Sequence, residues 1–258
     1  MLNLHQDTHR AHLVKSLSVP KPSIEKNMLH NLKQILGHKL AASDGTIGHV
    51  KDFYFDDKTW AIRYLLVDTS NWLTGRKVLI SPYSFGPLDY DGKVLSIKLT
   101  KKQIENSPAI DTDRPVSRQY EQNYYKYYGM PNYWEGGGVW GAGEYPEYSP
   151  TVRPYESLAY TYPQWDDINL RSTNAVTGYD IEATDGSLGS VSGFLVDQRK
   201  WQIRELTVET GHWYSGKEIL LMPSKIERIS CKEKKVFVSL TKGNLERTEE
   251  QHLATAVN

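Results

Sequence analysis

The chain has 258 residues, 39% of them hydrophobic and 24% charged, and its 31 basic side chains balance its 31 acidic ones. This composition is typical of a soluble globular protein, and a net charge of zero disfavours nonspecific binding to nucleic-acid phosphates. The longest apolar runs, such as residues 64–67, are far shorter than the roughly 20 residues of a membrane-spanning helix, so no such helix is predicted.

The first 30 residues are predicted to form an N-terminal tail. They lack the basic segment followed by an apolar segment that marks a secretory signal, and the lone Cys231 cannot form an internal disulfide. Both features predict a cytoplasmic protein. His5, His9 and His12 would share one face of a helix and could bind a transition metal there. No apolar periodicity supports a helix in this segment, so we predict no metal site.

The informative feature of the chain is an internal repeat. Residues 37–101 align with residues 178–242 without a gap, at a constant offset of 141 residues. Asp44-Gly45 and its counterpart Asp185-Gly186 predict tight hairpin turns with positive φ. Gly48 and its counterpart lie inside the next extended segment, where glycine usually marks a β-bulge or a close backbone contact. We therefore expect one curved sheet that is built twice.

The next strand, near residues 62–69, shows which face points inward. Alternate positions carry the same residue types in both copies, so we expect this shared face to line the barrel interior. On the other face, Tyr64 and Leu66 of the first copy become Glu205 and Thr207, a change that solvent tolerates and a core does not. Another segment should therefore cover Tyr64 and Leu66. The shared residues are Arg63, Leu65, Val67 and Thr69, which recur as Arg204, Leu206, Val208 and Thr210.

Each copy continues through a short apolar strand that ends at Pro82 or Pro223, where proline stops the ladder. A further strand follows, and Thr100 then provides an N-cap for a short helix before Pro108. Five or six short strands in about 65 residues predict a small closed β-barrel. The predicted fold class is mainly β: two small barrels in tandem, each followed by a short helix, joined by a Tyr/Gly-rich segment. The predicted boundaries are a tail at 1–30, a barrel at 31–110, a connector at 111–170, a second barrel at 171–250 and a tail at 251–258.

The first copy carries a recognisable spacing of glycine, apolar, acidic and tryptophan residues: Gly37-x2-Leu40, Asp44-Gly45-x2-Gly48-x-Val50, Phe53, Asp56, Trp60-x-Ile62, Leu65, Val67-Asp68, Trp72 and Pro82. This pattern resembles the PRC-barrel domain. The second copy fits the same pattern, and the duplication is most similar to the tandem PRC-barrel proteins of bacteria. The family also includes the barrel of the photosynthetic reaction centre H subunit and the C-terminal domain of ribosome maturation factors. The resemblance implies a docking or assembly module and brings no catalytic residue.

The connector is acidic and aromatic. Residues 120–162 hold 11 of the chain's 17 tyrosines, and residues 119–167 carry seven acidic and two basic side chains, a net charge of −5. Three interpretations remain open: an ordered connector that covers Tyr64 and Leu66, a surface for a partner or for self-association, and a flexible linker. The residues predicted to bind a partner are Tyr64, Leu66, Trp72, Trp213, Tyr124, Tyr125, Tyr127, Tyr128, Trp134 and Trp140.

No coherent catalytic set is visible in the sequence. Asp68 and Glu209 occupy matching positions, but they lie in separate barrels. Each is expected to stabilise its own loop or to pair with Arg76 or Lys217. His49 and His212 have no counterpart in the other copy, and Cys231 is expected to be an inert thiol. The basic residues Lys232, Lys234 and Lys235 are expected to form a solvated turn. We therefore predict no enzyme activity, no cofactor and no catalytic or metal site.

These observations predict a non-enzymatic cytoplasmic binding or scaffold protein with an unidentified protein partner. Pairing of the two barrels within one chain would replace the dimerisation of single-barrel relatives, giving a monomer or a weak homo-oligomer. Nucleic acid is not an expected partner. Two alternatives follow from the family resemblance alone: an adaptor in RNA processing or ribosome assembly, and an accessory of a membrane photosynthetic or electron-transfer complex.

Overall fold

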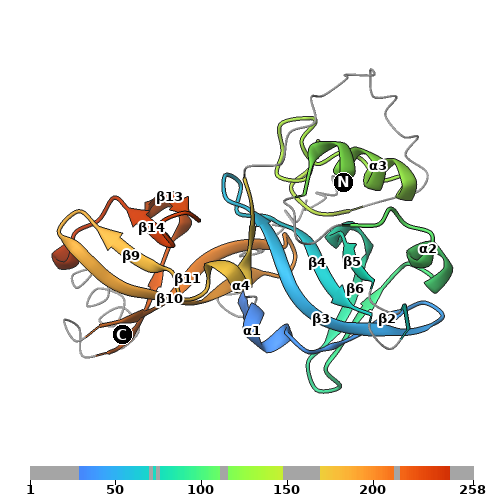
Figure 1. Ribbon diagram of the computed structural model, residues 1–258, viewed down its shortest axis with the longest axis horizontal. Helices are drawn as coiled ribbons and strands as arrows, with labels where there is room; N and C mark the ends of the chain where they lie inside the picture. The colour runs from blue at the N-terminus through green and yellow to red at the C-terminus, as the bar shows by residue number, and fades with distance from the viewer. Residues whose placement is uncertain are drawn as a thin grey trace, which may run out of the picture.

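The computed structural model describes residues 29–69, 72–73, 76–110, 116–147, 169–211 and 216–244. Within them, two seven-stranded sheets occupy the two halves of the molecule (Figure 1). This confirms the predicted mainly β architecture of two tandem domains. We call them barrel 1 and barrel 2. The strands of barrel 1 are β2 (Lys39–Ala42), β3 (Gly45–Asp56), β4 (Ile62–Asp68), β5 (Lys77–Ile80), β6 (Phe85–Asp89) and β7 (Val94–Ile97). The strands of barrel 2 are β9 (Asp180–Ala183), β10 (Gly186–Asp197), β11 (Gln202–Thr210), β12 (Glu218–Leu221), β13 (Ile226–Ser230) and β14 (Lys235–Val238).

The two barrels share one topology. Barrel 1 has the strand order β5-β4-β3-β2-β7-β6, and barrel 2 has the order β12-β11-β10-β9-β14-β13. The sheets differ from the expected closed barrels in one respect: among the described residues, no ladder joins the two ends of either order. The chain crosses this gap through the 3-10 turns η2 (Pro82–Ser84) and η4 (Pro223–Lys225). Their prolines lack the N–H group that a ladder requires.

The predicted hairpins and bulges are present. Gly45 and Gly186 follow the turns with φ of 137° and 118°, and each long strand then shifts its register against β2 or β9. A Cβ on Gly48 would lie 2.0 Å from the carbonyl oxygen of Asp68, because β4 passes directly against the backbone. The equivalent Gly189 has the same restriction. Glycine is therefore required at both bulges.

The shared apolar residues form the core, as expected. Leu65, Val67, Leu206 and Val208 have no exposed surface. The prediction was wrong for the two arginines of the shared set, which do not line a barrel interior. Arg63 is buried with its guanidinium on the aromatic connector, and its counterpart in barrel 2 is exposed. Both arginines are the unpaired residues of bulges in β4 and β11, which interrupt the strict alternation on which that expectation rested.

The segment that precedes each barrel pairs with the other barrel. Strand β1 (Leu29–Asn31) is antiparallel to β10, and strand β8 (Leu170–Ser172) is antiparallel to β3. The short helices α1 (Leu32–Ile35) and α4 (Thr173–Val176) then lead the chain back into its own barrel. The predicted pairing of the barrels within the chain is thus present as a reciprocal strand exchange.

Two tryptophans sit at the centre of the junction. The Ile62 N–H donates to the Trp201 carbonyl, and the Ile203 N–H donates to the Trp60 carbonyl, at 2.7 Å in both cases. Trp60 and Trp201 have φ of 60° and 47°, a conformation that costs bulky residues on the order of 1 kcal/mol or more. The reciprocity of these contacts is the mark of two-fold symmetry, here approximate and within one chain.

Asp52 strengthens one side of this junction. Its carboxylate accepts hydrogen bonds from the hydroxyl groups of Ser172 and Thr173 and, at 3.1 Å, from the backbone N–H of Asn174. These donors belong to β8 and the start of α4, whereas Asp52 belongs to β3. The equivalent position in barrel 2 is Gly193, so this carboxylate clamp exists only once.

Two further helices follow barrel 1. Helix α2 (Lys101–Glu105) begins at the predicted N-cap Thr100, which forms a capping box with Gln103. Helix α3 (Arg118–Tyr128) begins after Ser117 and ends at Gly129 in the left-handed conformation. Figure 1 shows α3 lying over barrel 1, above β4 and β5. Among the residues described, no helix has both the length and the apolar character needed to span a membrane.

Replacing Asp52 with alanine should weaken the junction. The change leaves three donors of the other half without their acceptor, so we expect the free energy of unfolding to fall by about 2–3 kcal/mol. Asp68→Ala is the matched control, because Asp68 is half exposed and lies 3.8 Å from Lys51; its loss should cost less than about 1 kcal/mol. Chemical denaturation of both variants measures the difference, and equal losses would contradict the role given to Asp52.

Candidate functional site

The outer face of barrel 1 is covered by α3. Tyr64 and Leu66, which the sequence predicted to need a cover, are 0% and 5% exposed. The ring of Tyr124 packs edge-on against Tyr64 with centroids 5.4 Å apart. The hydroxyl of Tyr124 also accepts the backbone N–H of Ser81 at 2.9 Å, beyond the end of β5. This part of the connector is therefore ordered and packed against its own barrel.

A buried carboxylate lies at the centre of this contact. Glu121 of α3 has no exposed surface, and its Oε1 accepts hydrogen bonds of 2.8 Å from the hydroxyls of Tyr64 and Tyr133. Its Oε2 lies 2.7 Å from Arg118 Nη1, one turn earlier on the helix. Because each oxygen has a partner, the charge is compensated, and the arrangement fixes the register of α3 on β4.

Arg63 joins the remaining part of the connector to barrel 1. Its guanidinium lies 3.8 Å from the ring centre of Tyr133 and 4.9 Å from that of Trp140, and Nη1 donates to the Val139 carbonyl at 2.6 Å. Trp140 continues the path to barrel 2, where its Nε1 donates to the Lys200 carbonyl at 2.7 Å. Sequence reasoning missed this role of Arg63. Little in the sequence signalled it, because both copies carry an arginine at this position and only the aromatic segment downstream of the first distinguishes them.

The ten residues predicted to bind a partner fall into three groups. Five are buried by contacts within the chain and present no surface in this structure. Four others are partly or well exposed, and of these Tyr127, 41% exposed, donates its hydroxyl to the Gln103 carbonyl of α2. The tenth, Trp213, lies outside the described residues. The buried group is Tyr64, Leu66, Tyr124, Tyr125 and Trp140, the partly exposed residues are Trp72, Tyr128 and Trp134, and the exposed one is Tyr127.

Barrel 2 presents the equivalent face without a covering helix among the described residues. Leu220 and Met222 are 44% and 48% exposed, whereas their counterparts Leu79 and Ser81 are 1% and 0% exposed beneath α3. Leu220 lies opposite Thr207 in the β11–β12 ladder, just as Leu79 lies opposite Leu66 in barrel 1. We call this surface of Glu205, Glu209, Glu218, Leu220 and Met222 the open face. Thr207, which the sequence predicted to face solvent, is only 3% exposed. The exchange of Tyr64 for Glu205 signalled a solvent-facing surface, but nothing in the sequence marked Leu220 and Met222 as exposed.

The open face carries acidic side chains in an arrangement that does not favour folding. Glu209 lies directly opposite Glu218, where barrel 1 has Asp68 opposite Lys77. Like charges in such a pair destabilise a sheet, while opposite charges support it. Within the described residues, Glu205, Glu209 and Glu218 form no ion pair. The face thus combines two exposed apolar side chains with acidic side chains that have no ion-pair partner in the described part of the chain.

The other candidates have ordinary structural contacts. Asp68 lies 3.8 Å from Lys51, and the guanidinium of Arg76 donates to the carbonyls of Glu105 and Ser107. His49 and Cys231 are exposed. His5, His9, His12 and His212 lie outside the described residues. Across the part of the chain that is described, no three His, Cys, Asp or Glu side chains are grouped to hold a metal ion.

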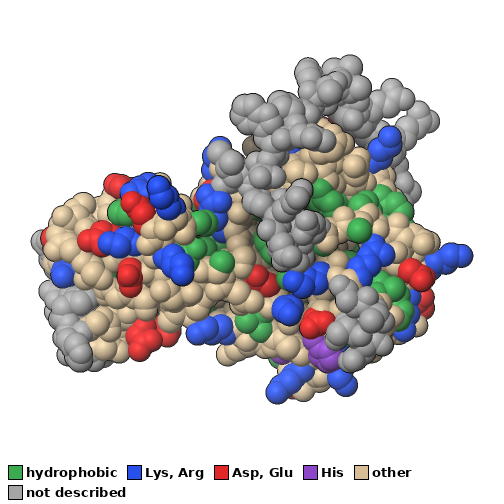
Figure 2. Space-filling model, viewed as in Figure 1, with side chains coloured by type: hydrophobic (Ala, Val, Ile, Leu, Met, Phe, Trp, Pro, Cys, Tyr) green, Lys and Arg blue, Asp and Glu red, His purple; other side chains and the backbone are tan. Residues whose placement is uncertain are grey.

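The lysines near the end of barrel 2 do not form an isolated basic patch. Lys235 lies 2.8 Å from Glu182, and Arg228 lies 3.1 Å from Glu233 in the same hairpin. Figure 2 shows basic and acidic side chains intermixed over barrel 2 on the visible face. This mixture gives the phosphate-binding interpretation no support.

Alkaline pH should unfold the α3 contact. Burial raises the pKa of Tyr83 to about 12, and burial followed by the charge of Glu121 raises that of Tyr64 well above 10. An unfolded tyrosine ionises near pH 10, so the stability from these groups is complete below pH 10 and is lost as pH rises toward their folded pKa values. Tyrosinate absorbance and circular dichroism should therefore change together between about pH 10 and 12. Ionisation of all tyrosines near pH 10 with the fold intact would contradict this.

Comparison with known proteins identifies barrel 1. Residues 32–105 match the family model described as the PRC-barrel domain. An uncharacterized protein of Deinococcus radiodurans is 33% identical over 93 residues, which cover 31% of this chain and 33% of that protein. The chain thus spans about a third of the length of this relative, whose description names no activity. The matched residues run from α1 to α2 and include every strand of barrel 1, β2 to β7. Residues 32–105 of this chain are therefore similar to the PRC-barrel domain.

Proposed function

We propose that this chain is a non-enzymatic, cytoplasmic scaffold protein that binds another protein through the open face of barrel 2. The observation that carries the proposal is the difference between two equivalent surfaces. In barrel 1 the face is covered by α3, whereas in barrel 2 it leaves Leu220 and Met222 about half exposed. Exposed apolar side chains next to charged ones are typical of a protein-interaction site.

The occupant that fits this surface is an amphipathic helix of a partner protein. The equivalent face already holds a helix in barrel 1, so the curvature of the sheet suits one. The chemistry of that partner follows from the charges of the open face. Glu205, Glu209 and Glu218 would be compensated by lysine or arginine beside the apolar stripe of the helix, which would also relieve the repulsion between Glu209 and Glu218.

The similarity to the PRC-barrel domain supports a binding role without specifying it. PRC-barrel domains resemble one another in fold more than in activity, and neither comparison brings a substrate or a catalytic residue. The two carboxylates that might have acted together, Asp68 and Glu209, lie on different barrels and are both at least partly exposed. These features favour a binding role over a catalytic one.

Photo-cross-linking in the source cell tests the proposal. A benzophenone amino acid at position 222 should cross-link to one partner segment with helical apolar periodicity and basic residues. The same probe at Lys232, an exposed position in the β13–β14 turn, is the matched control and should give no such product. Equal products at both positions, or products only with this chain itself, would contradict a partner on the open face.

The double variant Leu220→Ser/Met222→Ser gives a quantitative check with the partner so identified. Both side chains are exposed, so we expect stability to change by no more than about 0.5 kcal/mol. Binding should weaken at least about tenfold, because the complex loses apolar area worth more than about 1.4 kcal/mol. Unchanged affinity measured by calorimetry would rule out the open face as the binding surface.

A further inference from the structure

The approximate symmetry of the molecule creates two equivalent pockets at the junction of the barrels. The first is lined by Lys58 and Trp60 of barrel 1 and by Ile226 of barrel 2. The second is lined by their counterparts Arg199, Trp201 and Phe85, with the barrels exchanged. We call the first the open pocket and the second the covered pocket. Each places a cation and an indole from the β3–β4 or β10–β11 hairpin against the first residue of β6 or β13.

The covered pocket holds a segment of the connector. Tyr145, Pro146 and Glu147 form one of its walls. The ring centre of Tyr145 lies 5.3 Å from the guanidinium carbon of Arg199, and Glu144 lies 3.5 Å from Lys200 Nζ. The covered pocket therefore shows what kind of segment such a pocket binds: a tyrosine whose ring lies beside a cation, followed by a proline and flanked by carboxylates.

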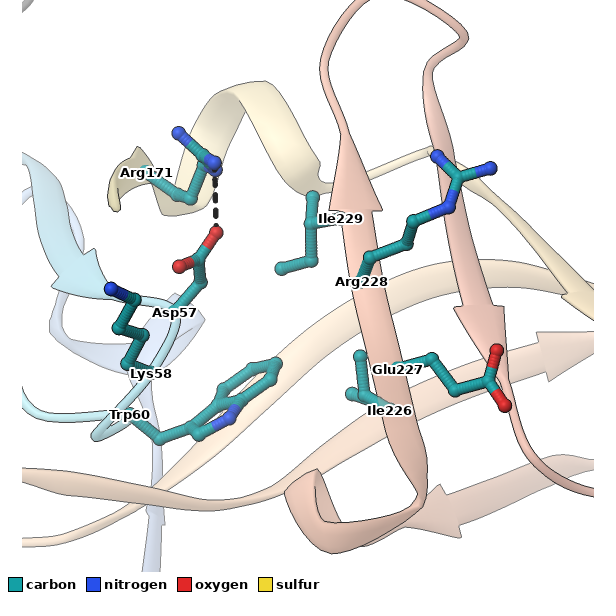
Figure 3. Close-up of a pocket in the computed structure, with 8 residues that line it drawn as sticks. All are labelled: Asp57, Lys58, Trp60, Arg171, Ile226, Glu227, Arg228 and Ile229. Carbon is teal, nitrogen blue, oxygen red and sulfur yellow. Dashed lines mark ion pairs between the residues drawn. The ribbon is translucent and has the colours of Figure 1, made fainter. Parts of the chain in front are cut away.

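The open pocket has the same elements, and no residue of the described connector lines it. Figure 3 shows the Trp60 ring facing Ile226 and Ile229, with Lys58 and Arg171 on the same side of the pocket as the indole. The cavity volume is about 260 Å³, below the range of roughly 300–1,000 Å³ for sites that enclose a drug-sized molecule. It therefore suits one or two side chains of a peptide rather than a cofactor.

Hydrogen-bond donors are available at the rim of the open pocket. Arg171 Nη2 forms an ion pair with Asp57 at 2.9 Å, but its Nε is buried with no hydrogen-bond partner in the described part of the chain. A buried donor without a partner is costly, so an acceptor that reaches it would be stabilised. Lys58 is exposed and forms no ion pair among the described residues. Both groups favour a carboxylate.

We propose that the open pocket binds a segment of a partner protein in which a tyrosine and a proline are followed by an acidic residue. The tyrosine ring lies beside Lys58, as Tyr145 lies beside Arg199, and the carboxylate accepts from Arg171 Nε. This site is separate from the open face, and either one can exist without the other. The chain's own Tyr162-Pro163-Gln164-Trp165 has a related sequence, but a neutral glutamine stands in place of the acid.

Titration with the peptide Gly-Glu-Tyr-Pro-Glu-Tyr, the sequence of residues 143–148, tests the site. With the full chain we expect saturable binding with Kd between roughly 10 and 1,000 μM, because few side chains are buried. Lys58→Glu should weaken binding at least about fivefold by placing a like charge next to the carboxylates. Arg199→Glu is the matched control in the covered pocket and should leave the affinity unchanged. Both substitutions alter side chains at the surface, and circular dichroism checks that each variant is folded.

Three results would overturn the proposal. The first is no binding of the peptide at millimolar concentration. The second is binding that resists Lys58→Glu and is lost in Arg199→Glu, because the peptide would then be displacing the connector from the covered pocket. The third is tighter binding after Tyr162 and Trp165 are both replaced with serine, because the chain's own segment would then be the occupant of the open pocket.

Discussion

The reciprocal pairing of β1 with β10 and of β8 with β3 joins the two barrels and sets how they face each other. Each of these strands has only three residues, so neither would be stable alone, and each is held by the sheet of the other barrel. The exchange brings the β3–β4 and β10–β11 hairpins together, and the carbonyls of Trp60 and Trp201 each accept an N–H from the opposite half. These hydrogen bonds offset the cost of the left-handed backbone conformation that both tryptophans adopt.

The junction is symmetric, but the outer faces are not. In barrel 1, Tyr64 and Glu121 connect β4 to α3 through a buried hydrogen bond, and Arg63 binds the rest of the connector. In barrel 2 the corresponding positions carry Glu205 and an exposed arginine, and no described helix lies over them. The two barrels thus share a fold but differ in what covers the equivalent face among the described residues. The described part of the connector adds to this difference, because it lines one junction pocket and not the other.

Much of the fold could be predicted from the sequence because its determinants are local or repeated. The bulge glycines, the buried Leu65 and Val67 and the N-cap Thr100 all follow from short-range rules that act in both copies or in one helix turn. The strand exchange could not be predicted, because three-residue strands carry no periodicity and their partners lie more than 100 residues away. The same limit applies to the candidate sites. The aromatic residues of the connector were conspicuous in composition, but most of those predicted to bind a partner are buried or partly buried within the chain. The exposure of Leu220 and Met222 could not be predicted, because it depends on the absence, in the described part of the chain, of a covering helix like the one that buries Leu79 and Ser81.

Native-state hydrogen exchange of the Ile62 and Ile203 amides tests the central claim most directly. Both amides donate across the junction at 2.7 Å, so they report on the contact between barrels rather than on either barrel alone. If the exchanged strands make the two halves one cooperative unit, both amides should be strongly protected and should exchange in the same opening event as the cores of both barrels. Rapid exchange at Ile62 and Ile203 while the β4 and β11 cores stay protected would show that the barrels separate freely, and would contradict this account.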